Sequence, residues 1–202
     1  MFLIYRKYIK RLLDIICALL ALILLSPLFI ILTIIGAIAM KGNPFFVQKR
    51  PGKNEKIFNI IKFRTMANIK DSNGNLLPDE KRLNGYGKFL RSTSLDEFPE
   101  AINILIGDMS VVGPRPLLVE YLERYSPEQH RRHEVKPGLS GWAQINGRNT
   151  VSWEDKFKYD VWYVDNVSIL LDVKIVLKTI VKMIKREGIS SDTNVTMEEF
   201  KG

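Results

Sequence analysis

Arg91-Ser-Thr-Ser-Leu-Asp-Glu-Phe-Pro-Glu-Ala-Ile-Asn-Ile-Leu-Ile-Gly-Asp-Met-Ser-Val-Val-Gly-Pro-Arg-Pro116 is the stretch of this 202-residue chain around which the rest is interpreted. Ser94 followed three residues later by Glu97 has the form of a capping box, which predicts a helix that begins at Ser94. Asp96 and Glu97 then lie in its first turn. Pro99 fits only near such a beginning, because deeper in the helix it would remove a backbone hydrogen bond.

The charges of this stretch suggest phosphate and metal chemistry. The first helical turn has unpaired N–H groups and the positive end of the helix dipole, so it holds anions. Arg91 lies close to the two carboxylates of Asp96 and Glu97, although acidic residues in a first turn are also ordinary capping. Further on, two prolines fix the backbone on both sides of Arg115, which favours bidentate phosphate binding by its guanidinium.

Residues 42–66 are predicted to form β structure with a turn at Pro51-Gly52, because the segment is rich in aromatic and β-branched residues. Lys62 and Arg64 alternate with Phe63, so both side chains face away from it. Such cations can reach into a cleft, although in most proteins they are solvated.

Residues 12–40 are almost wholly apolar. As one straight helix they would run about 43 Å, beyond the roughly 30 Å of a bilayer core. Pro27 lies near the middle and frees the carbonyl four residues earlier, which predicts a kink. The hydroxyl of Ser26 can satisfy the freed backbone groups.

Basic residues flank this segment on both sides, whereas a spanning helix usually has an excess of Lys and Arg on one side. We therefore interpret it as a re-entrant helix-break-helix hairpin with the globular part in the cytoplasm. A tilted transmembrane helix and a signal peptide are the alternatives. The apolar run is about twice the length of a signal h-region, and the rest has no cysteine framework.

The net charge of +8 and the isoelectric point near 9.5 indicate an anionic partner: nucleic acid, anionic lipid or a phosphorylated substrate. The single cysteine excludes an internal disulfide. Composition does not distinguish among these partners.

The second half of the chain is predicted to be mainly helical, with helices over 80–90, 117–134 (a second segment beginning at Pro127) and 168–187. His130 and His133 are three residues apart, but no further ligand completes a metal site, so we interpret them as part of a surface helix. The loop 136–148 ends in Arg148, a candidate phosphate or base ligand. The helix at 168–187 has an apolar face and a lysine face, as in helices that lie in the headgroup plane of a membrane.

Five motifs of the chain occur in the order and spacing of the bacterial sugar transferases: Lys62-Phe-Arg-Thr-Met66, Ser94-Leu-Asp-Glu97, Gly107-Asp-Met-Ser, Val112-Gly-Pro-Arg-Pro116 and Pro137-Gly-Leu-Ser-Gly-Trp-Ala-Gln-Ile-Asn-Gly-Arg148. The chain resembles the small, PglC-like monotopic phosphoglycosyl transferases over essentially its whole length, including the break at Ser26-Pro27.

The resemblance implies transfer of a sugar 1-phosphate from a UDP-sugar to undecaprenyl phosphate, with release of UMP. Asp96 would be the nucleophile and a Mg²⁺ ligand, and Glu97 would assist. An aspartate carboxylate can attack a phosphoryl centre, which divides one difficult transfer into two easier ones. Mg²⁺ and cations would neutralise the diphosphate; the expected cations are Lys62, Arg91, Arg115 and Arg148.

The expected fold is α+β: a re-entrant membrane anchor over residues 1–41, then a compact, mainly helical catalytic domain over 42–202 with a small β element and interfacial amphipathic helices. The expected location is the bacterial inner membrane with the site on the cytoplasmic face, next to anionic inner-leaflet lipids, without nucleic acid; a homo-oligomer stays open. The sugar is not identified, although N-acetylated amino sugars are plausible by resemblance. Two rival functions are a binding module without chemistry, and direct attack by the lipid phosphate in a ternary complex.

Overall fold

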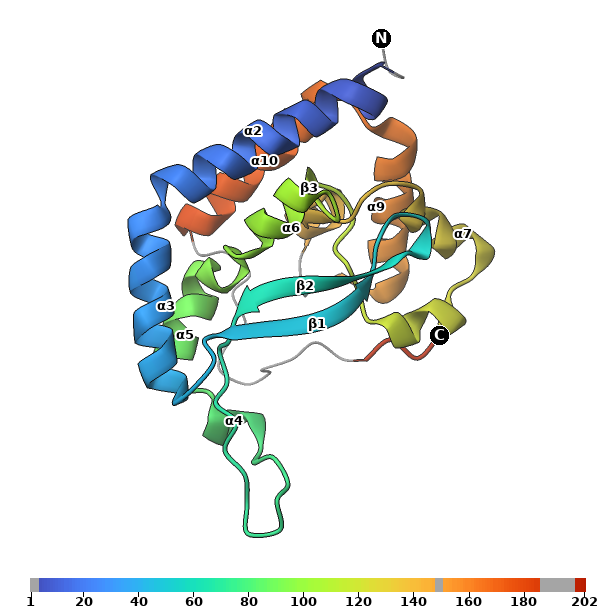
Figure 1. Cartoon of the computed structure of the whole chain (residues 1–202). Coiled ribbons are helices and arrows are strands. Elements are labelled where there is room, and N and C mark those ends of the chain that lie inside the picture. The colour runs from blue at the N-terminus through green and yellow to red at the C-terminus, as the bar shows by residue number, and fades with distance from the viewer. Residues whose placement is uncertain (1–3, 148–150, 186–198) are drawn as a thin grey trace.

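Two helices at the N-terminus form a bent pair along one edge of the molecule (Figure 1). The computed structural model describes residues 4–147, 151–185 and 199–202. A π-helical turn, Tyr5–Ile9, leads into α2, Lys10–Leu24, and α3, Ser26–Met40, follows with Pro27 in its first turn. The hydroxyl of Ser26 donates a hydrogen bond of 2.9 Å to the carbonyl of Ile23, which is the carbonyl that Pro27 leaves without a donor. The predicted kink and the predicted role of Ser26 are both confirmed.

The bend between the two helices is 65°. Within the described residues no single helix is long and apolar enough to cross a membrane, whereas the pair Tyr5–Leu24 and Ser26–Met40 passes that test together. Large apolar side chains are exposed along both helices, far more than a soluble surface normally shows as one patch. They are Leu12, Leu13, Ile16, Leu19, Leu20, Ile23, Leu24, Leu25, Ile30, Ile31, Ile34, Ile35 and Ile38.

Polar side chains of α2 bond it to α6, Glu100–Ile106, and to strand β3, Ser110–Val112. Arg11 donates to the carbonyls of Ile104 and Leu105 at 2.6 and 2.8 Å, at the end of α6 where helical carbonyls lack partners. Asp14 is buried and accepts hydrogen bonds of 2.9 Å from the hydroxyl of Ser110 and from the N–H of Val111.

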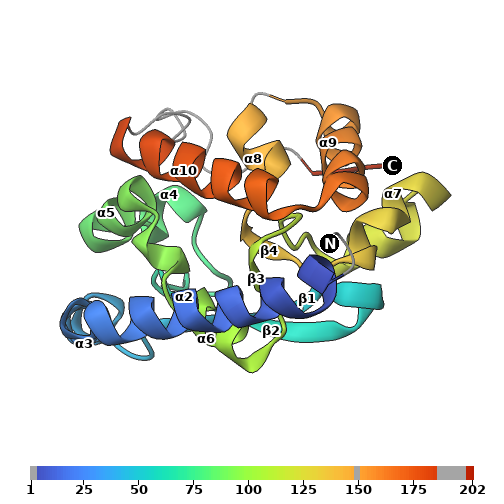
Figure 2. The same cartoon turned by 90° about the horizontal axis from the view of Figure 1, so that it is seen from above.

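The start of the bent pair is also joined to the start of α10, Ile169–Lys185. Asp172 of α10 accepts hydrogen bonds from the hydroxyl of Tyr5 at 2.6 Å and from that of Tyr163 at 2.7 Å, and its carboxylate pairs with Lys10 at 2.6 Å. Figure 2, which looks down from above Figure 1, shows α2 and α10 running roughly parallel across this side of the molecule. The bent pair is therefore attached to the rest by buried polar contacts as well as by the chain.

The predicted β segment forms a hairpin of β1, Phe45–Pro51, and β2, Ile57–Phe63, with Phe46 opposite Lys62. A 3₁₀ turn, Lys53–Glu55, connects the strands. Side chains alternate between the two faces of a strand. Phe45 and Phe63 lie on one face, where they pack with Phe29 of α3. The other face carries Lys62 at one end.

A second, parallel pair of strands was not predicted: β3, Ser110–Val112, and β4, Gly138–Ser140. A side chain at Gly113 would place its Cβ 2.3 Å from the carbonyl oxygen of Lys136, so only glycine allows this approach. The strands are three residues long, and a hydrophobic pattern so short is indistinguishable from loop.

The remaining helices surround these two sheets. The predicted second segment beginning at Pro127 is confirmed, and the capping box of Ser126 and Gln129 starts it. The prediction of continuous helix on either side of that point is wrong, because residues 117–134 contain three short pieces, two of them 3₁₀. The helices are α4 Asp79–Arg82, α5 Gly85–Thr93, a 3₁₀ turn Leu95–Glu97 (η3), α6 Glu100–Ile106, η4 Val119–Arg124, α7 Pro127–His130, η5 Arg131–Glu134, α8 Trp142–Asn146, α9 Trp153–Asn166 and α10 Ile169–Lys185.

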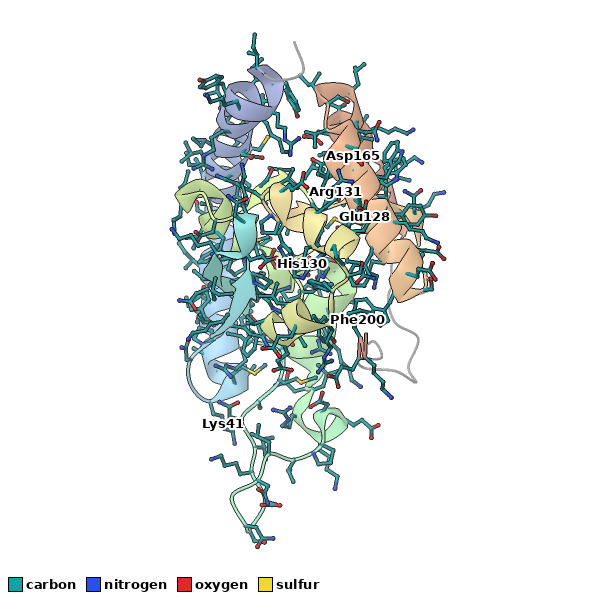
Figure 3. All side chains as sticks on the ribbon, turned by 90° about the vertical axis from the view of Figure 1, so that its right-hand side faces the viewer. Lys41, Glu128, His130, Arg131, Asp165 and Phe200 are labelled. Atoms are coloured by element: carbon teal, nitrogen blue, oxygen red, sulfur yellow. The ribbon has the colours of Figure 1, made fainter. Side chains whose placement is uncertain are left out.

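Arg131 links the short helices to α9. Its guanidinium pairs with Glu128 at 2.9 Å and with Asp165 of α9, and Figure 3 shows the three side chains close together. Below them in the same view lies Phe200, which is buried against the rings of Tyr121 and Phe157. The C-terminal residues thus pack under η4 and α9.

Candidate active site

The two adjacent carboxylates lie in the 3₁₀ turn η3, between α5 and α6. The predicted capping box at Ser94 is wrong. Ser94 has a φ of 57° and ends α5 in the left-handed conformation, and its side chain makes no cap hydrogen bond. The N–H of Ser94 instead donates to the carbonyl of Arg91, and the carboxylate of Glu97 bonds to two cations.

Glu97 is the acid that these cations neutralise. Lys62 Nζ donates to Glu97 Oε1 at 2.9 Å, and Arg115 donates to the same oxygen. Burial alone would raise the pKa of Glu97, but the charges of Arg115 and Lys62 hold the pKa of this carboxyl well below its ordinary value. Glu97 is therefore an anion that anchors two cations in the site.

The pKa of Asp96 is shifted in the opposite direction from that of Glu97. Burial and the negative charge of Glu97 raise its pKa from 3.8 to about 6, and the charges of Lys62, Arg115 and Arg91 limit the rise. Within the described part of the chain its carboxylate makes no side-chain hydrogen bond or ion pair. Two neighbouring carboxylates with pKa values pushed apart are typical of sites in which one group reacts and the other holds charge.

A third carboxylate, Glu100, was missed by the sequence analysis. It is only 2% exposed, and its Oε1 lies 2.9 Å from Lys62 Nζ. Burial and the charge of Glu97 raise its pKa to about 7. The one signal in the sequence was the spacing of three from Glu97, which brings two side chains to the same side of a helical segment.

A buried ion pair, which the sequence analysis also missed, contacts the backbone of Arg115. Arg132 donates to the backbone carbonyl of Arg115 at 2.7 Å and pairs with Asp160 of α9, also at 2.7 Å. The side chains of Arg132 and Asp160 are 2% and 3% exposed. No local pattern indicates this pair, because the two partners are 28 residues apart in separate helices.

The remaining predicted cations have different positions. Arg91 donates to the hydroxyl of Thr65 at 3.1 Å, and its charge helps to limit the pKa of Asp96. Arg64 does not contact the carboxylates; it donates to the backbone carbonyls of Asn43 and Phe45. Arg148 lies outside the described residues.

The site residues fit a magnesium ion that is bound together with substrate. Among the described residues no group of three or more His, Cys, Asp or Glu side chains could hold a metal ion. Mg²⁺, however, is usually held by one or two carboxylates together with substrate phosphates and water. The carboxylate of Asp96 has no competing cation bonded to it, unlike that of Glu97, and suits such a role.

The two histidines do not form a metal pair. His130 Nδ1 lies 2.5 Å from Glu55 Oε1, whereas His133 is buried with its Nδ1 3.2 Å from the carbonyl of Gly52. The prediction of a surface helix is wrong for His133, because its side chain packs against the β1–β2 turn. Burial lowers the pKa of His133 to about 4, so it is neutral at pH 7.

The fold and the site together define a small protein with a lipid-compatible helix pair bonded to a cluster of carboxylates and cations. The chain belongs to the bacterial sugar transferase family, whose model matches residues 5–186.

Named relatives span a range of lengths. The chain is 53% identical over 196 residues to the uncharacterized sugar transferase EpsL of Bacillus subtilis, covering 96% of each protein. It is 39% identical to the exopolysaccharide production protein ExoY of Sinorhizobium fredii, covering 85% of this chain and 83% of that protein. It is 41% identical to the UDP-glucose:undecaprenyl-phosphate glucose-1-phosphate transferase of Klebsiella pneumoniae, covering 86% of this chain and 39% of the longer protein. The chain thus spans about two-fifths of such longer relatives.

Proposed function

We propose that this protein transfers a sugar 1-phosphate from a UDP-sugar to undecaprenyl phosphate through a covalent intermediate on Asp96. One observation carries the proposal: Asp96 lies in a cation-lined site and its carboxylate is bonded to none of the described side chains, while the adjacent Glu97 already neutralises Lys62 and Arg115. The printed names of relatives from Salmonella typhimurium and Klebsiella pneumoniae, which describe sugar-phosphate transfer to undecaprenyl phosphate, support the same reaction class.

In the first step an Asp96 carboxylate oxygen attacks the sugar-bearing phosphorus of the donor. The O–P bond to Asp96 forms, and the bond from phosphorus to the bridging oxygen breaks with its electron pair, so that UMP leaves. In the second step an oxygen of the lipid phosphate attacks the same phosphorus and expels the carboxylate of Asp96. Lys62, Arg115 and Arg91 lie where they can offset charge that develops on the phosphates; we assign Arg148 to the same role.

Mg²⁺, bound by Asp96 and the donor diphosphate, would supply charge neutralisation of that diphosphate. The protein residues then have distinct tasks. Asp96 must be ionised to attack, and a pKa of about 6 leaves it mostly ionised at pH 7. Glu97 keeps Lys62 and Arg115 oriented, because both cations bond to one of its oxygens.

We also propose that residues 1–41 enter one leaflet of the cytoplasmic membrane and return, so that the catalytic domain, residues 42–202, stays on the cytoplasmic face. The 65° bend and the exposed apolar side chains on both arms support a re-entrant anchor. The amphipathic α10, with Leu170 81% exposed, would rest on the same interface.

The printed names of the relatives differ in the sugar that they specify. Relatives carry names that specify galactose, glucose and N-acetylgalactosamine, so similarity to them does not select one.

The test uses purified protein in nanodiscs with Mg²⁺ and a panel of UDP-sugars, without a lipid acceptor. We expect UMP release and an intact mass increased by one sugar phosphate, both abolished in Asp96→Asn and retained in the control Asp165→Asn. UMP release only after undecaprenyl phosphate is added would favour direct attack in a ternary complex. No turnover with any donor and acceptor would favour a binding module.

A further inference from the structure

Arg50 occupies the same face of the β1–β2 hairpin as Lys62. Phe46 is paired with Lys62, and Arg50 is four residues further along β1, so its side chain points to the same face. The two positions are about 14 Å apart along the strand. Arg115 lies between the two cations. It donates to the same Glu97 oxygen as Lys62, and the carbonyl of the next residue, Pro116, accepts a hydrogen bond from Arg50.

Arg50 is partly buried and has no carboxylate partner among the described residues. Its Nη2 donates to Gln48 Oε1 at 2.6 Å and its Nη1 to the carbonyl of Pro116 at 3.4 Å. Its Nε is buried without a hydrogen-bond partner. Arg115 and Arg132, by contrast, each pair with an acid.

A partly buried guanidinium without an anion is unfavourable, and a second positive charge nearby makes it more so. Burial and the charge of Arg115 both lower the pKa of Arg50. A bound anion would neutralise the guanidinium of Arg50 and screen it from Arg115. Guanidinium groups suit phosphate particularly well, because their N–H groups match its oxygens.

We infer that Arg50 binds the phosphate of the departing UMP, that is, the donor phosphate remote from the sugar. This inference rests on the proposed function. Asp96 attacks the sugar-bearing phosphorus, and Arg115 is the cation whose charge acts on both Asp96 and Arg50. A diphosphate that begins at Asp96 and passes Arg115 therefore brings its second phosphate toward Arg50. There the guanidinium offsets the charge that the leaving phosphate gains when the bridging bond breaks.

Lys49 provides a matched control. It lies next to Arg50 in β1, is exposed, and points to the opposite face of the hairpin. Removing its charge changes the net charge of the protein by the same amount without touching the inferred phosphate position.

The experiment measures UMP binding by calorimetry to nanodisc-held wild type, Arg50→Gln, Arg50→Lys and Lys49→Gln. We expect Arg50→Gln to weaken UMP binding about tenfold to a hundredfold, the range for a lost charge-assisted hydrogen bond. Arg50→Lys should lose less affinity than Arg50→Gln, since the charge remains although the match of the guanidinium to the phosphate oxygens is lost, and Lys49→Gln should retain the full affinity. The unfolding temperature of each variant shows whether it is folded.

Equal losses in Arg50→Gln and Arg50→Lys would overturn the inference. That result would mean that Arg50 has a structural role: its guanidinium donates to both Gln48 and the carbonyl of Pro116, and lysine cannot replace both hydrogen bonds. Unchanged UMP affinity in Arg50→Gln would overturn it as well, while leaving the proposed function in place. A wild-type protein that binds no UMP would remove both the inference and the function on which it rests.

Discussion

The substitution Asp96→Asn should stabilise the protein while it abolishes the reaction. In the folded protein the pKa of Asp96 is about 6, above the 3.8 of an unperturbed aspartate. A raised pKa means that the folded state disfavours the ionised form, which asparagine cannot adopt. The net effect already includes the attraction of Lys62, Arg115 and Arg91, which only partly offsets burial and the charge of Glu97.

The size of the effect follows from proton linkage. At 1.36 kcal/mol per pH unit, the difference between 3.8 and about 6 corresponds to about 3 kcal/mol in the free energy of unfolding at pH 7.5. Between these two pKa values the folded wild type binds more protons than the unfolded chain, so its stability falls as the pH rises. The advantage of Asp96→Asn should be about half as large at pH 5 and vanish below about pH 3.8.

Glu97→Gln is the matched control, because it removes the neighbouring charge with the same change of atoms. The fold favours the ionised form of Glu97. Removing this charge leaves Lys62 and Arg115 without their anion and should lower the free energy of unfolding by about 2–3 kcal/mol. The assay is thermal unfolding in detergent between pH 5 and pH 8. For a chain of this size, Asp96→Asn should raise the midpoint by about 6–12 °C at pH 7.5. An unchanged or lower midpoint, or a gain that does not depend on pH, would refute the reasoning.

Three further predictions concern the reaction and the parts that support the site. The single-turnover rate of adduct formation should fall about tenfold between pH 7 and pH 5, as Asp96 becomes protonated; a flat profile would contradict the raised pKa. Asp160→Asn should destabilise the fold by about 3–5 kcal/mol, because Arg132 stays buried without its partner, and should lower kcat through Arg115; a variant of wild-type stability would contradict this. Phe200→Ala should cost about 3–5 kcal/mol in the free energy of unfolding, since the ring is buried, and a loss below about 1 kcal/mol would show that the C-terminal residues contribute little.

The sequence predicted those features that local chemistry determines. Pro27 removes one identifiable hydrogen bond, so both the bend and the acceptor of the Ser26 hydroxyl could be named in advance. The β1–β2 hairpin followed from a run of aromatic and β-branched residues around a Pro-Gly turn. Lys62 could be placed near the acids through the family resemblance, whereas its alternation with Phe63 showed only which way it faces.

Features that depend on contacts between distant segments could not be predicted. Ser94 and Glu97 have the spacing of a capping box, yet tertiary ion pairs outweigh a cap worth about 1 kcal/mol. Glu100 reads as an ordinary helix residue until burial against Lys62 raises its pKa. The β3–β4 pair depends on the close approach of Gly113 to residues near 137, which no local pattern encodes.

The bonds of α2 have a consequence for the biosynthesis of the protein. Arg11 and Asp14 leave the ribosome early, but their partners are 93 to 97 residues later in the chain, and that of Lys10 is 162 residues later. At roughly 5–20 residues per second, Asp172 is synthesised about 8–30 s after Lys10. Arg11 and Asp14 lack their partners for more than half of that interval, and Lys10 lacks its partner for all of it, so the helix can reach its final bonded position only when translation is nearly complete. Delivery to the membrane and folding of this chain are then one coupled process.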